Sequence, residues 1–198
     1  MVSQPAYLAN LKSYAKLRFV GDDEEEARIR VRDLDSESDR GAIILAATNI
    51  EDMLELRILQ RLPTLHHDET TRKFVFEQDG PISTFSRKIL MAYAMGIVDK
   101  PYRKLIDLVR EIRNACAHSR QPISLEVPEL QEACKVVISD IWPDIKDHNP
   151  RTIRMAFVMK CTFIQHYILH GEKLEGREAH LAHWEKLKRE GVNGWSKP

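Results

Sequence analysis

The sequence predicts an all-α protein built as a single multi-helix bundle. Apolar residues recur at three- and four-residue spacing through most of the chain, which is the periodicity of an amphipathic helix. Glycine (8 residues) and proline (9 residues) are sparse and cluster where the periodic segments end. With 198 residues and 43% hydrophobic content, the chain can fill one substantial core, so we expect one domain over residues 1–198.

The charge balance and hydropathy exclude several classes of protein. Thirty Lys and Arg residues balance thirty Asp and Glu residues, so any contact with nucleic acid must come from a local basic patch. The longest apolar run, residues 42–47, is far shorter than the ~20 residues of a membrane helix, and no membrane partner is expected. The start of the chain lacks the pattern of a secretory signal, which favours a cytoplasmic location.

Neither a cofactor nor a metal is expected. The three cysteines, Cys116, Cys134 and Cys161, contain no Cys-x-x-Cys pair and lie in apolar helical segments, which favours core packing over a disulfide or a zinc site. Histidines occur in helical pairs that permit metal binding, but no acidic or cysteine ligand follows at a familiar spacing. These pairs are therefore expected to be surface or interface residues: His166 with His170, and His180 with His183.

Residues 1–35 are expected to form an N-terminal helix, over 4–19, followed by a charged arm. In the arm, an acidic stretch at 22–26 precedes three arginines that alternate with period two: Arg28, Arg30 and Arg32. This pattern fits a short strand or an extended segment. The arginines would either grip a phosphate backbone or form a surface that neutralises its own acids, and the neighbouring carboxylates favour the second.

Residues 36–170 are expected to form the core bundle. The strongest periodic segment predicts a long central helix over 38–62, which Pro63 should end. A short helix over 66–78 should follow, before the Asp-Gly-Pro turn at 79–81.

Capping residues mark the next two helices. Either Ser83 or Thr84 can cap a helix that ends at Gly96, which is suited to the left-handed position after a helix. Pro101 suits the first turn of a helix over 101–118.

Two more bundle helices are predicted over 128–142 and 151–170. Residues 171–198 should add a C-terminal helix and tail. The apolar residues of that helix are Leu181, Trp184 and Leu187.

A polar cluster ends the otherwise apolar helix over 101–118. Asn114 and His118 are four residues apart and share a face, whereas Arg113 lies about 140° around the helix from His118. A facing helix, or a second subunit across a twofold axis, would be needed to complete a compact site.

These residue types suit metal-independent RNA cleavage. His118 can accept or donate a proton near neutral pH, and Arg113 can hold a phosphate and neutralise the charge that develops on it. Asn114 would orient the histidine or the RNA. The structural alternative is that Arg113 and His118 only interact with the last carbonyls of their helix.

Four segments together resemble the mannitol operon repressor family over residues 38–120. They are SDRGA at 38–42, DGPISTFS at 79–86, AYAMG at 92–96 and IRNACAH at 112–118. The resemblance implies a cytoplasmic, bacterial, all-helical protein of a family named for repression of a sugar-alcohol operon.

The Arg-Asn-x-x-x-His run also resembles the signature of the HEPN superfamily, which contains helical dimeric ribonucleases and nucleotide-binding modules. That resemblance places Arg113 and His118 at the site with Asn114 beside them. The acidic helper of the superfamily would correspond to Glu51 or Asp52, which suit a solvated helix surface equally well.

Residues 87–108 read as helix, turn and helix, with three cations where a recognition helix would touch DNA: Lys100, Arg103 and Lys104. The apolar content of the second helix favours burial in the bundle instead of DNA reading.

Three functions remain open, all in a homodimer. The first is a non-catalytic regulator of carbohydrate-operon expression that acts through a protein partner or a nucleic acid, either RNA or operator DNA. The second is a metal-independent endoribonuclease that uses Arg113 and His118. The third is an interaction module in which the same turn only closes the dimer.

Overall fold

The computed structural model describes residues 34, 36–77, 79–142 and 149–170. Seven helices and no strand occur in these ranges, which confirms the all-α prediction. The helix expected over 4–19, the alternating arginines at 28–32 and the C-terminal helix beyond 170 lie outside the described residues.

The helices follow one another with short connections in the described ranges. In chain order they are α3 (Asp39–Gln60), α4 (Pro63–His67), α5 (Glu69–Phe76), α6 (Phe85–Ala94), α7 (Lys100–His118), α8 (Pro128–Ile138) and α9 (Pro150–His170).

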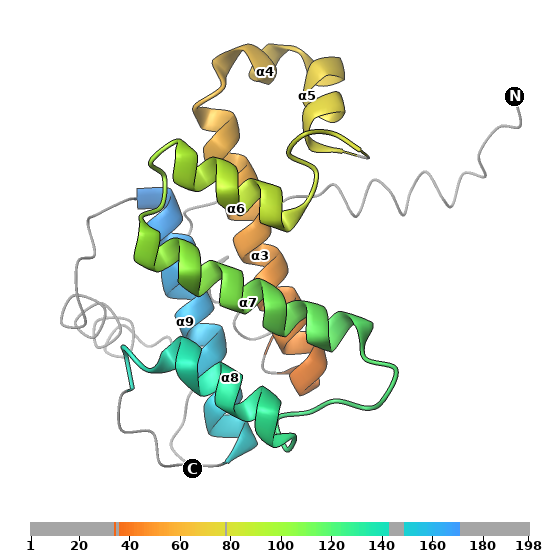
Figure 1. The fold of residues 1–198 in the computed structure, drawn as a ribbon, viewed down its shortest axis with the longest axis vertical. Helices are drawn as coiled ribbons and strands as arrows, with labels where there is room; N and C mark the ends of the chain where they lie inside the picture. The colour runs from red at the N-terminus through yellow and green to blue at the C-terminus, as the bar shows by residue number, and fades with distance from the viewer. Residues whose placement is uncertain (1–33, 35, 78, 143–148, 171–198) are drawn as a thin grey trace, which may run out of the picture.

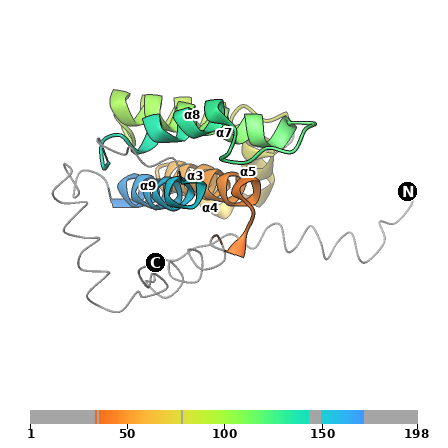
Figure 2. The same cartoon turned by 90° about the horizontal axis from the view of Figure 1, so that it is seen from below.

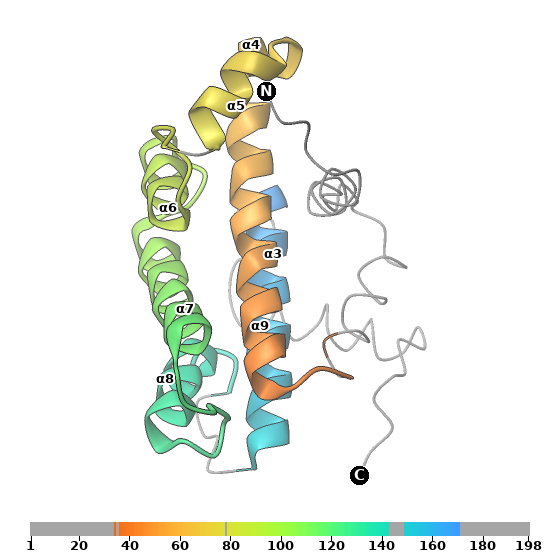
Figure 3. The ribbon, with the colours of Figure 1, turned by 90° about the vertical axis from the view of Figure 1, so that its right-hand side faces the viewer.

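The bundle has two layers. The long helices α3 and α9 lie side by side in one layer, and α6, α7 and α8 form the other (Figures 1 and 2). Both long helices begin at the same end of the bundle, where Arg154 Nη1 donates to the carbonyl oxygen of Glu37 over 2.8 Å. Figure 3 shows the two layers edge-on, with α4 and α5 at one end of α3.

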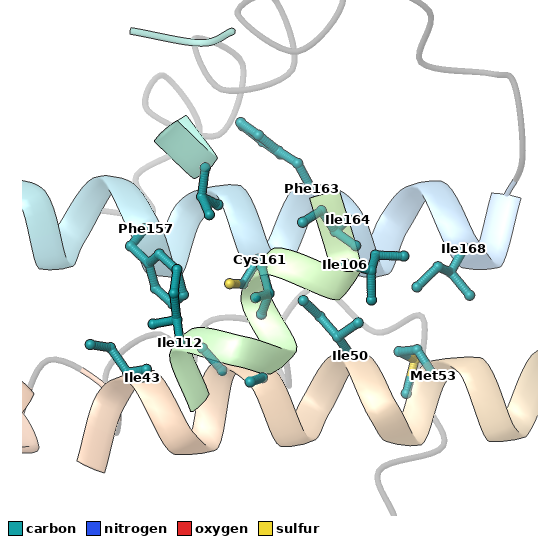
Figure 4. Close-up of a cluster of buried hydrophobic side chains, with 14 of the residues drawn as sticks. Ile43, Ile50, Met53, Ile106, Ile112, Phe157, Cys161, Phe163, Ile164 and Ile168 are labelled. Carbon is teal, nitrogen blue, oxygen red and sulfur yellow. The ribbon is translucent and has the colours of Figure 1, made fainter. Parts of the chain in front are cut away.

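The core fills the space between the layers. Ile50 from α3, Ile106 from α7 and Phe157 from α9 are each fully buried and point into the same cluster (Figure 4). Because α3 packs against α9, α7 and α6, it buries side chains on several of its faces. This explains why its sequence is apolar over most of its circumference.

The start of α3 agrees with its prediction, and its end differs slightly. Ser38 caps the helix, since its Oγ accepts a hydrogen bond from Gly41 N over 3.1 Å. Pro63 follows the helix as predicted, but it also begins α4, where a proline needs no backbone donor.

The prediction of a single short helix over 66–78 is wrong in detail. Two helices, α4 and α5, occupy this region and break at Asp68. The Asp68 carboxylate accepts from Thr71 N over 2.9 Å, so it starts a new helix instead of continuing the previous one.

The turn at 79–81 brings backbone very close to α5. A Cβ on Gly80 would lie 2.3 Å from the carbonyl oxygen of Phe74 and 2.5 Å from that of Val75. A glycine is therefore required at this position for steric reasons.

The capping predictions for α6 and α7 are confirmed. Thr84 caps α6, and Gly96 adopts φ +66° just beyond its end. Asp99 caps α7 through Tyr102 N, with Pro101 in the first turn. By contrast, α8 ends at Ile138, short of the predicted residue 142, because the chain turns at Ser139.

Candidate functional site

The polar cluster at the end of α7 reaches solvent. His118 is the last residue of the helix and its side chain is exposed, while Arg113 and Asn114 are half-buried. The imidazole makes no hydrogen bond within the described part of the chain. His118 is thus accessible to a ligand.

Asn114 connects the two charged members of the cluster. Arg113 Nη1 donates to Asn114 Oδ1 over 3.1 Å, so the guanidinium turns toward the helix face that carries His118. Helical geometry alone places Arg113 about 140° from His118, and the flexible side chain recovers part of that separation. The Arg113 Nε is buried and has no hydrogen-bond partner in the described ranges.

A residue from another helix caps the end of α7. Arg40, in the first turn of α3, donates from Nη2 to the carbonyl oxygen of Ala117 over 3.1 Å. The sequence offered Arg113 and His118 for this helix-ending role, and Arg40 takes it instead. Arg40 is a site residue that sequence reasoning missed, although it lies in the SDRGA segment at 38–42 that carries the family resemblance.

The chain beyond His118 is also held by α3. Asp39 Oδ2 accepts a hydrogen bond from Leu125 N over 2.9 Å, and Arg154 Nη1 lies 3.5 Å from the other carboxylate oxygen. Two consecutive side chains of α3 therefore position the end of α7 and the loop that follows it.

The two candidate acidic helpers lie elsewhere in the chain. Glu51 Oε1 is 2.9 Å from Lys88 Nζ on α6, and Glu55 Oε2 is also 2.9 Å from that amine. Glu51 is eleven residues beyond Arg40, which corresponds to about 16 Å along α3. The structure therefore does not bring Glu51, or Asp52 beside it on α3, to His118 within one chain.

Lys160 on α9 is a second buried cation, in addition to Lys88 on α6. Lys160 is fully buried and forms an ion pair with Asp140. The ring of Tyr102 stacks on that of Tyr167 with centroids 3.6 Å apart. Burial, and secondarily the charge of Asp140, raise the pKa of Tyr102, so its hydroxyl stays protonated at neutral pH.

The cysteines are buried and free, as predicted from their apolar context. Burial raises the pKa of Cys116 to about 11, and it raises the pKa of Cys134 and Cys161 as well. Since the thiolate is the nucleophilic form, Cys116 offers no nucleophile to the nearby cluster at neutral pH.

Other sequence features do not add to the site. The rings of His166 and His170 lie 4.3 Å apart on α9, and the described residues contain no group of three His, Cys, Asp or Glu that could hold a metal. His180 and His183 lie outside the described residues. Within the same ranges, none of the helices has the length and apolar character needed to cross a bilayer.

The α6–α7 segment is part of the bundle, as its apolar content predicted. Ile106, Val109 and Ile112 of α7 are buried, while Lys100 and Lys104 remain exposed. Because its inner face is packed in the core, α7 presents only one side and its ends to a partner.

Comparison of the chain with protein-family models, with curated proteins and with solved structures gives no match. Function can therefore be inferred only from the short motifs and from the geometry around His118.

Proposed function

We propose that this chain is a regulatory protein of the mannitol operon repressor type. It acts as a helical dimer on carbohydrate-operon expression, through a nucleic-acid or protein partner. The observation that supports this proposal is the cluster of the exposed His118 with the half-buried Arg113 and Asn114, at an end of α7 that contacts from Arg40 and Asp39 of α3 hold in place.

The electrostatics of the cluster suit an anionic partner. The C-terminus of a helix carries partial negative charge and ordinarily disfavours anions. The Arg40 guanidinium offsets that charge at the Ala117 carbonyl, and Arg113 supplies a further cation one turn away. A phosphate of RNA or operator DNA can then accept hydrogen bonds from Arg113 and from His118.

Binding to nucleic acid tests this route directly. We would measure fluorescence anisotropy with a single-stranded RNA oligonucleotide and a DNA duplex over a series of salt concentrations. Arg113→Gln should weaken binding and reduce the slope of log K against log salt by about 0.7 for the single strand. The matched control is Arg57→Gln, since Arg57 is a cation of α3 that hydrogen-bonds Gln60.

No binding of either probe at low ionic strength would contradict the nucleic-acid route. Equal losses in the Arg113 and Arg57 variants would contradict the role of the cluster. The chain would then act through a protein partner.

The second candidate function is a metal-independent endoribonuclease. It is favoured by the exposed imidazole of His118, which has no hydrogen bond within the described residues, and by the Arg113 guanidinium five residues before it on α7. In such a reaction the ribose 2′-oxygen attacks the phosphorus, the bond to the 5′-oxygen breaks, and a 2′,3′-cyclic phosphate forms. His118 would transfer the proton and Arg113 would stabilise the charge on the phosphate oxygens.

RNA cleavage in EDTA tests the second function. His118→Ala should abolish cleavage and shift the Tm by no more than a few degrees, because the side chain is exposed. Arg120→Ala, a change at an exposed cation two residues away, should retain activity. Absence of cleavage across several RNAs would contradict the nuclease and leave the regulator.

A further inference from the structure

The side of α7 that faces away from the core carries a regular stripe of residues. The stripe alternates three- and four-residue spacing, the period that lets two helices pack nearly aligned at about 20°. Its members are Pro101, Lys104, Leu108, Glu111, Ala115 and His118, of which all but the half-buried Leu108 are exposed. Most of the stripe faces solvent, and Leu108 lies at its edge, half-buried against the core.

Apolar side chains flank the stripe on both sides. Leu90 on α6 is 54% exposed, Val136 on α8 is 60% exposed, and Tyr93 on α6 is also exposed. In the layer they share, α6 lies on one side of α7 and α8 on the other (Figure 1), while α3 and α9 cover the opposite surface (Figure 2). Arg103 stacks 4.9 Å from the Tyr93 ring centroid and restrains that ring at the surface.

The charges on the stripe complement those of an antiparallel second copy of the stripe. Lys104 and Glu111 lie two turns apart, with Leu108 between them. A twofold axis that crosses α7 near Leu108 would make the second copy of α7 antiparallel. Each Lys104 would then lie opposite Glu111 of the partner subunit, and Leu108 would meet its own copy.

The same axis also pairs each flanking helix with its own copy. It places α6 against α6 and α8 against α8, so that exposed apolar residues meet each other across the interface. Lys104 has no ion-pair partner within the described part of its own chain. Glu111 pairs with the neighbouring Arg110 but retains acceptor capacity for a second cation.

We propose that a second copy of this chain docks on the outer-layer face, defined by Leu90, Tyr93, Lys104, Leu108, Glu111 and Val136, with the two α7 helices antiparallel. The inference rests on the dimer of the proposed function and specifies which surface forms it. Apolar contacts at Leu108 and on both sides of α7 provide the driving force, and the two Lys104–Glu111 pairs set the register.

This geometry sets the distance between the polar clusters of the two copies. The two copies of His118 would be about 30 Å apart along the helix axis, so the dimer has two separate sites in place of one shared site. Each Ala115, one turn before His118, would lie opposite Lys100 of the partner subunit. The partner therefore adds a cation beside each cluster.

Charge reversal tests the register in the full-length protein by sedimentation equilibrium. Lys104→Glu alone and Glu111→Lys alone each create two like-charge pairs, and each should raise the Kd of the dimer at least about tenfold. The double variant restores opposite charges and should return the Kd toward that of the wild type. An equimolar mixture of the two single variants should form heterodimers, because both of its pairs are attractive.

Leu90→Ser tests the apolar part of the face, with Leu45→Ser as the matched control. Leu45 is 43% exposed on α3, in the other layer. The first change should weaken the dimer and the second should not. A wild-type chain that stays monomeric at high micromolar concentration would contradict the dimer of both proposals. A dimer that is insensitive to both charge reversals would contradict this face alone.

Discussion

Arg40 Nη2 donates a hydrogen bond to the carbonyl oxygen of Ala117 over 3.1 Å, although the two residues are 77 positions apart in the chain. The cation that satisfies the end of α7 thus comes from the first turn of α3. This contact satisfies the Ala117 carbonyl, so that neither Arg113 nor His118 is needed to cap it.

Removing that contact should destabilise the fold. Arg40→Ala is expected to lower the free energy of unfolding by about 1.5–3 kcal/mol, the range for a partly buried hydrogen bond to a charged group. Urea unfolding measures the change. Arg57→Ala removes an exposed hydrogen bond to Gln60 and should change stability by less than about 0.5 kcal/mol. Equal losses in the two variants would show that the Ala117 contact contributes nothing specific.

The buried lysine of α6 should be far more sensitive than a surface lysine. Lys88→Met leaves Glu51 and Glu55 without their cation in a buried setting, and it should cost about 3–5 kcal/mol. Lys73→Met removes the ion pair with Glu69, in which the two side chains are 43% and 66% exposed, and should cost less than about 1 kcal/mol. Thermal unfolding of both variants provides the comparison, and similar Tm values would contradict the buried cluster.

Two glycines should respond differently to alanine. Gly80→Ala places a methyl group against the backbone of α5, so we expect a loss of about 2 kcal/mol or more. The added Cβ of Gly96→Ala meets no atom within 4 Å. This variant should therefore lose only about 1–2 kcal/mol of stability, the cost of a left-handed backbone conformation. Denaturant unfolding separates the two. A Gly96 variant less stable than the Gly80 variant would contradict the close approach at the turn.

Stability should fall in alkaline solution because of the buried thiols. The pKa of Cys116 is raised from 9.0 to about 11, so above pH 9 the unfolded chain releases this proton while the folded chain retains it. The stabilising contribution is therefore complete below pH 9 and is lost as the pH rises to about 11. Its slope is about 1.4 kcal/mol per pH unit within that window.

Comparison with Cys116→Ala isolates this thiol. Cys134 and Cys161 remain in both proteins, and their titration shifts stability in the same direction in each. The variant should show a shallower decline of unfolding free energy between pH 9 and 11. Parallel curves for the two proteins would mean that Cys116 titrates normally in the fold.

Much of the fold follows from local sequence signals. Thr84, Pro101 and Gly96 mark helix starts and ends, and each has the expected role in the structure. The break at Asp68 was not predicted, because residues 66–73 are all polar and offer no apolar spacing that could separate two short helices. Periodicity therefore located the helices better than it located their boundaries.

The site was predictable only in part. The Arg-Asn-x-x-x-His run identified Arg113, Asn114 and His118, since these residues are close in sequence and share one helix end. Arg40 and Lys88 carried no comparable signal. Their partners lie on other helices, and a periodic pattern contains no information about which helices touch.

By itself, the sequence determined that the chain is helical, where most helices begin, and which side of each helix is apolar, because capping and amphipathic periodicity depend on neighbouring residues alone. Only the tertiary structure decided that Arg40 closes the end of α7, that Glu51 pairs with Lys88 instead of approaching His118, and that the His118 imidazole is exposed. The physical reason is that these contacts depend on how helices cross and rotate against each other, which the packing of the whole core sets.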